Sequence, residues 1–326
     1  MKDYELRICI EFDTNSIIML SYRTDRLLRI LQTLFTVNRA KKISRLERIK
    51  TLIENWVFEL RIADACKNSG FNKEVNFIRT NGITDFPYEQ LIDSPNFEYG
   101  IDSQNHLPYV VHKGKKLFFP QSFTLDFCKM LYKRYIDTEC ILGGHYREKC
   151  PHQYQTESFC IKEGDILVDV GCAEALLSLD AIDKVSKVYL LETDKKWIQA
   201  LNETFKDYSD KVVIINKFAS GTDSDSTITL KSLLCGEVDK SLFIKMDIEG
   251  AEVEVLNGSK EFLKSVKNLK LACCTYHRQD DAEEIEKIYK ELNLNFEYSD
   301  GYMIFVFDEC QKPPYFRHGV IRGWKQ

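Results

Sequence analysis

A short apolar strand that ends in an acidic residue and a turn with one glycine is the feature that most constrains this chain. Residues 166–169 read Ile-Leu-Val-Asp, Gly171 makes a tight turn, and residues 175–185 are apolar at helical spacing. A strand, a glycine turn and a helix in this order form the first unit of a doubly wound parallel sheet. Because such sheets bind ligands at the carboxyl ends of their strands, the turn predicts a binding site.

The residues of this turn indicate what kind of ligand binds. A dinucleotide-binding turn needs G-x-G-x-x-G, because its glycines let the backbone approach a pyrophosphate. Here Asp169 precedes Gly171, and Cys172, Ala173 and Glu174 follow it, so two carboxylates stand where they would repel a phosphate. An acidic turn with one glycine favours a cationic ligand without phosphates. S-adenosylmethionine, with its sulfonium and amino groups, is such a ligand, and these five residues are predicted to bind it.

A second strand also ends in an acid. Residues 187–192 are apolar up to Glu192, which lies roughly 20 residues past the first turn, where a ribose-binding carboxylate is expected. Glu192 is predicted to take both ribose hydroxyls, with Thr193 beside it in the cofactor site; a strand-end acid that only faces solvent is the alternative. After a third strand, Asn216 and Ala219 are predicted to line the adenine.

Two further strands are predicted to end at the same edge of the sheet. Residues 242–246 form a buried strand that is followed by Asp247, Glu249 and Gly250. Residues 269–275 form the fifth strand, and His277 follows it. Since the carboxyl ends of parallel strands open on one crevice, these polar side chains are expected beside the cofactor.

These segments resemble one known family. The run Asp169-Val-Gly171, the strand ending in Glu192, the segment Lys245-Met-Asp-Ile-Glu-Gly-Ala-Glu252 and the segment Cys273-Cys-Thr-Tyr-His-Arg278 are together similar to the FkbM-type methyltransferases. The resemblance covers about half of the chain. It implies an S-adenosylmethionine-dependent O-methyltransferase that acts on a hydroxyl, most plausibly of a saccharide or a saccharide-linked intermediate. One departure is Ala175, where the family more often has glycine.

The expected fold class is α/β, with the doubly wound, seven-stranded, Rossmann-like sheet of class I methyltransferases. Its last two strands are expected at residues 295–298 and 302–307, as a terminal hairpin that turns at Asp300-Gly301. A helix over residues 282–292 precedes this hairpin. The aromatic and basic residues 315–324 are expected either to fold over the site or to pack on the sheet as a tail.

The sequence divides into three expected parts: a helical region at 1–85, a hairpin, helix and linker at 86–150, and the methyltransferase domain with its tail at 151–326. The hairpin is expected at residues 107–119, turning at Lys113-Gly114, as a small cap beside the site. Residues 23–50 are strongly basic. Such a surface either attracts an anionic glycan, nucleotide-linked substrate or lipid head group, or is an ordinary solvated helix face.

Composition limits the class of protein. The net charge of −5 argues against a general affinity for nucleic acid, and neither a transmembrane helix nor a signal peptide is expected from the apolar pattern. The 11 cysteines are scattered, which predicts a reducing cytoplasm. The expected partner is a small-molecule or glycan acceptor, and peripheral membrane contact and a homo-oligomer are left open.

Two residues are candidates for the chemical step. His277 titrates near neutrality in an unperturbed setting and is the candidate general base. Asp247 is its alternative or its orienting partner, or it holds a divalent metal with Glu249; nothing in the spacing demands a metal, and none is assumed. The acceptor is expected against His152, Tyr154, Glu249 and Arg278, although ordinary loop packing explains a histidine and a tyrosine equally well.

Other readings of the sequence stay open. A nicotinamide-dependent oxidoreductase would use the same kind of sheet, but the G-x-G-x-x-G fingerprint is missing. A non-catalytic cofactor-binding protein would not need the polar crevice. The residues Cys140, His145, Cys150 and His152 are of zinc-ligand types, but their spacing lacks the C-x2-C pair of structural zinc sites.

Overall fold

The computed structural model describes residues 55–66, 70–89, 96–143, 150–305 and 312–325. The chain divides into two compact units, Met1–Arg61 and Ile62–Gln326. Residues 55–61 of the first unit are helical, and the basic stretch at 23–50 lies outside the described residues. Within the described parts of the chain, no helix combines the length and the apolar composition that crossing a bilayer requires.

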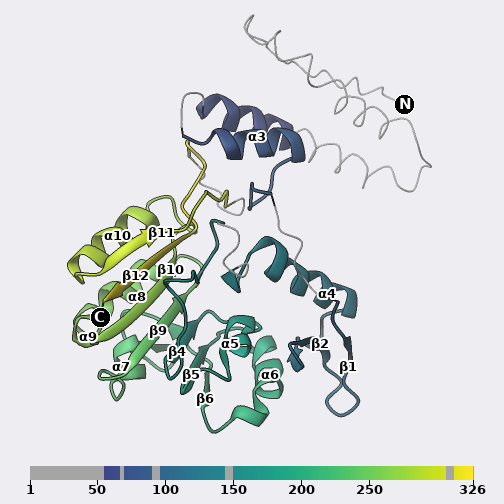
Figure 1. Cartoon of the computed structure of the whole chain (residues 1–326), viewed down its shortest axis with the longest axis vertical. Helices are drawn as coiled ribbons and strands as arrows, with labels where there is room; N and C mark the ends of the chain where they lie inside the picture. The colour runs from purple at the N-terminus through teal and green to yellow at the C-terminus, as the bar shows by residue number, and fades with distance from the viewer. Residues whose placement is uncertain (1–54, 67–69, 90–95, 144–149, 306–311, 326) are drawn as a thin grey trace, which may run out of the picture. The chain divides into compact units, whose positions relative to one another are not determined.

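A seven-stranded sheet forms the centre of the second unit, in the order β11-β12-β10-β9-β4-β5-β6 (Figure 1). The strands are β4 (Ile166–Val170), β5 (Lys187–Leu191), β6 (Val212–Ile215), β9 (Ser241–Met246), β10 (Asn268–Cys274), β11 (Asn295–Tyr298) and β12 (Val320–Lys325). The five strands from β10 to β6 run parallel, and β12 is antiparallel to both of its neighbours. This is the predicted class I methyltransferase sheet.

Both faces of the sheet are covered by helices, which explains why its strands are continuously apolar. In β4, Leu167 belongs to one hydrophobic cluster and Val168 to the other. The first cluster contains α5 (Leu176–Ala181) and α6 (Lys195–Thr204), and the second contains α7 (Leu230–Leu234), α8 (Glu252–Gly258), α9 (Lys260–Ser265) and α10 (Asp281–Glu291). The side chain of Asp194 caps α6 by accepting a hydrogen bond from the Lys196 N–H.

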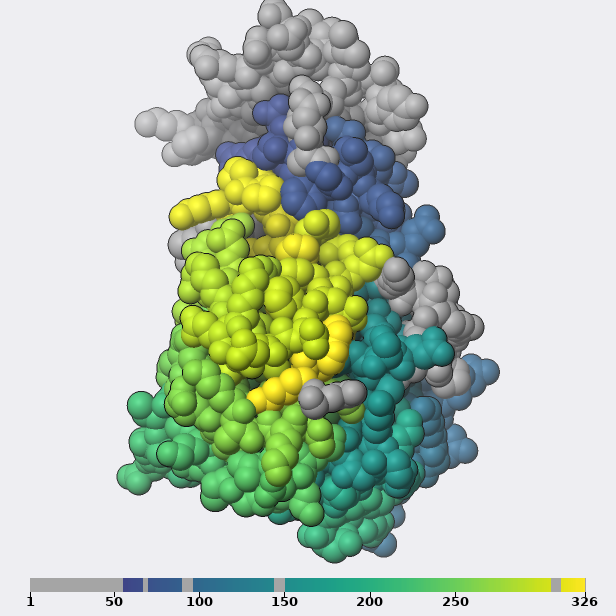
Figure 2. All heavy atoms as spheres, turned by 60° about the vertical axis from the view of Figure 1, so that its left-hand side comes forward, coloured from purple at the N-terminus to yellow at the C-terminus, as the bar shows by residue number. Residues whose placement is uncertain are grey.

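The predicted terminal hairpin is wrong in its second strand. The strand beside β11 is β12, which comes from the C-terminal tail, whereas Met303 makes only an isolated bridge with Arg317. Val320 and Ile321 are fully buried, and a Cβ at position 323 would lie 2.5 Å from the Tyr289 ring. Arg322 and Gly323 interrupt the apolar pattern of β12, which lies inside the sheet between β11 and β10. Figure 2 shows this yellow segment at the surface between yellow-green and teal parts of the chain.

A small cap precedes the sheet. It consists of β1 (Tyr99–Ile101), β2 (Pro108–His112), β3 (Lys115–Phe118) and α4 (Leu125–Lys133), which continues as a π-helix over Arg134–Thr138. The hairpin turns at Lys113-Gly114, as predicted, with positive φ at both residues. The Phe118 N–H donates to the Thr204 hydroxyl of α6 at 3.0 Å, so the cap packs directly on the methyltransferase fold. The remaining short elements are α3 (Asn72–Asn81), β7 (Phe218–Ala219), β8 (Thr227–Ile228) and a 3-10 turn at Lys206–Tyr208.

Candidate active site

The turn after β4 touches the turn after β9, and only glycine fits between them. Gly171 has φ +74°, and a Cβ there would lie 1.9 Å from the carbonyl oxygen of Asp247. The Asp247 N–H donates to the Val170 carbonyl at 3.0 Å, which locks the two strand ends together. The sequence-predicted site therefore forms where β4 and β9, neighbours in the sheet, both end.

A buried ion pair that the sequence reading missed holds this turn. Lys245 Nζ lies 3.0 Å from Asp169 Oδ1 and donates to the Gly171 carbonyl at 2.5 Å. The hydroxyl of Ser178 donates to the other oxygen of Asp169 at 2.8 Å. Burial alone would lower the pKa of Lys245, but the carboxylates of Asp169 and Asp247 more than offset it and raise that pKa. Asp169 thus anchors the turn that follows β4.

Glu192 links the turn that follows β4 to the turn that follows β5. Its Oε2 accepts a hydrogen bond from the Ala173 N–H at 2.9 Å, and its Oε1 accepts one from the Asp194 N–H at 2.7 Å. The side chain is only 9% exposed. A carboxylate offers about four lone-pair sites, so each oxygen keeps capacity for a ligand hydroxyl.

A cavity of ≈ 100 Å³ opens at these strand ends. Eight of the predicted site residues line it: Asp169, Gly171, Cys172, Ala173, Glu174, His152, Tyr154 and Asp247. Its walls also include Tyr135, Glu139 and Lys245. Four acidic side chains, those of Glu139, Asp169, Glu174 and Asp247, lie around this mostly apolar hollow. They suit a cationic group and would repel a phosphate, as the sequence of the turn predicts.

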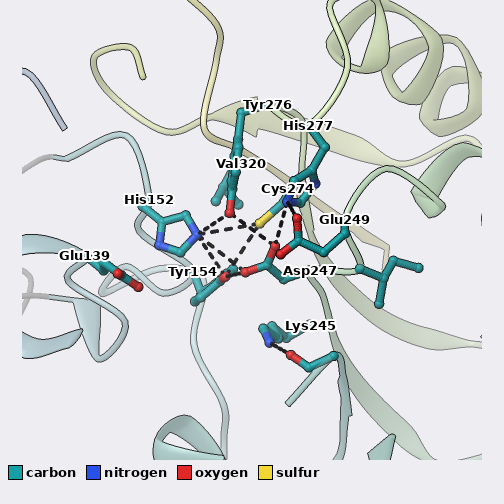
Figure 3. Close-up of polar contacts among 12 residues, drawn as sticks. Glu139, His152, Tyr154, Lys245, Asp247, Glu249, Cys274, Tyr276, His277 and Val320 are labelled. Atoms are coloured by element: carbon teal, nitrogen blue, oxygen red, sulfur yellow. Dashed lines mark hydrogen bonds and ion pairs between the residues drawn. The ribbon is translucent and has the colours of Figure 1, made fainter. Parts of the chain in front are cut away.

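Asp247 is the centre of a network in which each of its oxygens faces a different histidine (Figure 3). Oδ2 accepts a hydrogen bond from the Tyr154 hydroxyl at 2.8 Å and lies 3.7 Å from His152 Nε2. Oδ1 accepts one from the Tyr276 hydroxyl at 3.2 Å and lies 3.3 Å from His277 Nε2. Burial opposes ionisation, yet the two histidines and Lys245 hold the pKa of Asp247 well below its usual range.

His277 lies between carboxylates on both sides of its ring. Nδ1 is 2.9 Å from Glu252 Oε1, and Nε2 faces Asp247 and, at 3.7 Å, Glu249 Oε2. Burial by itself would lower the pKa of His277, but the hydrogen bonds and charges of Asp247 and Glu252 raise it to about 10. The ring is therefore an imidazolium at neutral pH in this state, and its proton must leave before it can act as a base.

A comparison of the sequence with models of protein families identifies the family of this chain. Residues 132–299 match the methyltransferase FkbM domain, which is slightly more than half of the chain. The chain belongs to the FkbM methyltransferase family. The match begins in α4 and ends just after β11, so it spans the whole network around Asp247. A search of curated proteins finds no match.

Solved structures share the fold at low identity. A precorrin-6y C5,15-methyltransferase from Geobacter metallireducens is 14% identical, covers 51% of this chain and 83% of its own, and has a TM-score of 0.35. The magnesium protoporphyrin IX methyltransferase of Synechocystis, solved with bound SAM, is 10% identical, covers 50% and 71%, and has a TM-score of 0.33. The family assignment rests on the match over residues 132–299 and not on these likenesses.

Not every residue predicted from sequence reaches the cavity of this FkbM-family methyltransferase. Asn216 donates to the carbonyls of Glu192 and Thr193 at 2.7 and 3.1 Å, so it supports the turn after β5. Thr193 and Ala219 are half-buried outside the cavity lining. Arg278 is exposed, and its N–H donates to Asp281 at 2.7 Å. Their predicted contacts with cofactor or acceptor stay predictions.

The sequence reading missed Lys245, Tyr276, Glu252 and Cys274. Lys245 offered a signal, because it stands two residues before Asp247 and therefore on the same face of β9. Glu252 is fully buried and stands at the start of α8, where an acidic residue ordinarily interacts favourably with the helix dipole. Of the four zinc-type residues, His145 lies outside the described residues, and His152 belongs to the Asp247 network.

Glu174 gives a prediction about stability and pH. Burial raises the pKa of Glu174 to about 8 from an ordinary value of 4.5. Between pH 4.5 and 8 the folded chain keeps a proton that the unfolded chain has lost, so stability is expected to fall as the pH rises through this window. Glu174→Gln is expected to flatten this slope and to be more stable at pH 8 by up to about 5 kcal/mol.

Urea unfolding at about pH 5 and about pH 8 measures the effect of Glu174→Gln. The exposed carboxylate of Glu163 provides the matched control, because Glu163→Gln is expected to leave the difference between the two pH values unchanged. Equal pH slopes for wild type and Glu174→Gln would contradict the raised pKa.

Proposed function

We propose that the chain is an S-adenosylmethionine-dependent O-methyltransferase whose acceptor is a hydroxyl of a saccharide or a saccharide-linked intermediate. The observation that carries the proposal is the convergence of Glu192, the Gly171 turn and Asp247 at one edge of the sheet. The family match supports methyl transfer. The hydroxyl acceptor and its saccharide nature come from the resemblance of the sequence to FkbM-type enzymes.

The residues at these strand ends fit the cofactor. Glu192 lies outside the cavity lining and accepts a hydrogen bond from the N–H of Ala173, which lines it. The free lone pairs of Glu192 suit two ribose hydroxyls, and the Asp169 carboxylate suits the cationic amino and sulfonium groups. A cationic ligand beside Glu174 would also favour the ionised form of its carboxyl group. Gly171 lets the turn after β4 lie against the Asp247 carbonyl, which brings together the two turns that line the cavity. The bound cofactor would supply an activated methyl group on sulfur.

The chain's own residues would prepare the acceptor. Asp247 and His277 are proposed to hold the hydroxyl and to accept its proton, while His152, Tyr154, Glu249 and Arg278 are proposed to surround the acceptor. The acceptor oxygen forms a bond to the methyl carbon as the carbon–sulfur bond breaks, and the sulfonium becomes a neutral thioether. A positioned base contributes roughly 100- to 10,000-fold to such a step. Alignment and exclusion of water contribute the rest.

Removal of the Glu192 carboxylate tests the cofactor site. Glu192→Ala is expected to weaken S-adenosylhomocysteine binding by about 1.5–3 kcal/mol, or about 10- to 150-fold, because hydrogen bonds to a charged group are lost. Calorimetric titration measures this, and Glu163→Ala, on the exposed loop before β4, is the control that should bind normally. Unchanged affinity in a folded Glu192→Ala protein would remove Glu192 from the site.

The same titrations separate the proposed activity from its rivals. A nicotinamide-dependent oxidoreductase would bind NAD, whereas the proposed enzyme binds S-adenosylhomocysteine and not NAD. A non-catalytic cofactor-binding protein would bind S-adenosylmethionine without consuming it in the presence of any hydroxyl acceptor. A cytoplasmic location and an acceptor that is a small molecule or a glycan belong to this proposal.

A further inference from the structure

Three carboxylates surround the ring of His277. They belong to Asp247, Glu249 and Glu252, at 3.3, 3.7 and 2.9 Å from the ring nitrogens. The Oε2 atom of Glu252 is buried and has no hydrogen-bond partner among the described residues, although Glu252 is 0% exposed. The ammonium group of Lys245, whose charge acts on Asp247, already contacts Asp169 and the Gly171 carbonyl.

The two nitrogens of His277 face different carboxylates. Glu252 Oε1 lies against Nδ1 and also accepts a hydrogen bond from the Ile248 N–H at 2.9 Å, so its position is fixed by the backbone. Nε2 points the other way, toward Asp247 and Glu249 (Figure 3). A histidine that binds a metal is held in this manner, with one nitrogen against a carboxylate and the other directed at the ion.

The opposite side of Asp247 does not offer the same space. Among the described residues, two groups of ligand types have atoms within 4.8 Å of one another: Asp247, Glu252 and His277, and His152, Asp247 and Cys274. In the group that contains His152, the Tyr154 hydroxyl lies among the ligand atoms. It is 3.0 Å from His152 Nε2, 2.8 Å from Asp247 Oδ2 and 3.5 Å from Cys274 Sγ. An ion there would have to displace this buried hydroxyl, so that side carries no site.

The chain reverses sharply to bring Glu249 to the side of His277. Glu249 has φ +57° and Gly250 has φ +95°, and a left-handed conformation at a glutamate costs about 1–2 kcal/mol. After this turn, Glu249 Oε2 lies 3.7 Å from His277 Nε2. This side chain is 82% exposed, so an ion can enter from solvent and the carboxylate can move to meet it.

We propose that Asp247, Glu249 and His277 bind a divalent cation, with Glu252 orienting His277. Two ligands at right angles around such an ion are about 3 Å apart when each bond is roughly 2.1 Å. The observed distances from His277 Nε2, 3.3 Å to Asp247 and 3.7 Å to Glu249, require only small movements. One imidazole and two carboxylates suit Mn²⁺ and leave coordination positions for water or an acceptor oxygen.

This inference rests on the proposed methyl transfer and assigns a role within it. The cation binds the acceptor hydroxyl and lowers its pKa, so that the O–H proton leaves to solvent water. The oxygen then takes the methyl group, and the cofactor sulfur keeps the electron pair of the broken bond. In the cation-bound protein the lone pair of His277 Nε2 would bind the ion. His277 would then position the cation, and this role replaces the proton-accepting role proposed above for the cation-free protein.

Titration of the EDTA-treated full-length chain with Mn²⁺, followed by the loss of the free-ion electron paramagnetic resonance signal, tests the site. Wild type is expected to bind one Mn²⁺ saturably. Glu249→Gln is expected to weaken binding at least about 10-fold, since it removes a charged ligand without disturbing buried packing. Glu252→Gln is expected to weaken it about 10- to 100-fold, the usual effect of changing a residue that orients a metal ligand. Glu261, whose side chain is 87% exposed on α9, gives the control, and Glu261→Gln should bind as wild type does.

Two results would overturn the cation site: no saturable Mn²⁺ binding by wild type, or equal affinities in wild type, Glu249→Gln and Glu252→Gln. Calorimetric binding of S-adenosylhomocysteine to the same EDTA-treated protein keeps this failure apart from failure of the proposed function. Cofactor binding without Mn²⁺ binding overturns the cation site alone. Loss of both overturns the methyltransferase site on which it rests.

Discussion

Asp247→Asn is expected to lower kcat by at least about 100-fold while S-adenosylhomocysteine affinity stays within a few-fold of wild type. The Asp247 carboxylate is at the centre of the network. It accepts hydrogen bonds from the hydroxyls of Tyr154 and Tyr276, and it faces His152 and His277. The amide keeps the shape of the side chain but removes the charge that holds the acceptor proton or a cation. The group acts on the acceptor and not on the ribose, so kcat changes and cofactor affinity does not.

His277→Gln is expected to produce a loss of similar size. Glutamine is preferred to alanine because its amide can still face Glu252, whereas an unpaired buried carboxylate would destabilise the fold by about 3–5 kcal/mol. Steady-state kinetics on both single variants and on the double variant measures whether the two residues act together. One proton-accepting or cation-binding unit predicts that the double variant loses less than the product of the two losses.

Two kinetic outcomes would change this assignment. Multiplicative losses in the double variant would mean that Asp247 and His277 contribute to separate steps. A His277→Gln enzyme with near-normal kcat would remove the histidine from the chemistry and leave Asp247 as the activating group. Thermal unfolding of each variant is the control, because a kinetic loss counts only in a protein that remains folded.

The sequence predicts the sheet well wherever one short segment carries the whole signal. The strands β4, β5 and β9 are continuous apolar runs that end in an acid, and each follows or precedes a helix with its own apolar spacing. The prediction of the last strand is wrong because residues 302–307 are a continuous apolar run that follows an Asp-Gly turn, which is a strong local hairpin signal. In β12, Arg322 is buried because its guanidinium bonds Glu297 and the Gln153 carbonyl. No local pattern reveals such a partner.

The site also contains residues that the sequence predicts and contacts that it does not predict. Asp169, Gly171 and Asp247 could be found from sequence because the ends of neighbouring parallel strands converge, whatever the rest of the chain does. The pairing of Lys245 with Asp169, and of Glu252 with His277, depends on which side chains face each other across two elements. The raised pKa of His277 follows from its contacts with Asp247 and Glu252. Because sequence alone does not show these contacts, it predicts only the unperturbed, near-neutral pKa of a histidine.

Gly171→Ala is expected to destabilise the fold by about 2–5 kcal/mol and to weaken S-adenosylhomocysteine binding at least about 10-fold. Two effects add: the left-handed conformation at φ +74° costs an alanine about 1–2 kcal/mol, and the overlap with the Asp247 carbonyl costs about 1–3 kcal/mol more. The overlap forces apart the two turns that line the cavity, so the binding site changes together with the stability.

Gly114 separates these two effects, because it has φ +81° on the exposed hairpin turn and a Cβ there would meet nothing within 4 Å. Gly114→Ala therefore carries the conformational cost alone, and urea unfolding should show a loss of about 1–2 kcal/mol with normal cofactor affinity. The difference between the two variants measures the close approach of β4 and β9. If Gly171→Ala were no more destabilising than Gly114→Ala, the contact between the two turns would not be what requires glycine at position 171, and the cavity would owe its shape to the Lys245–Asp169 pair instead.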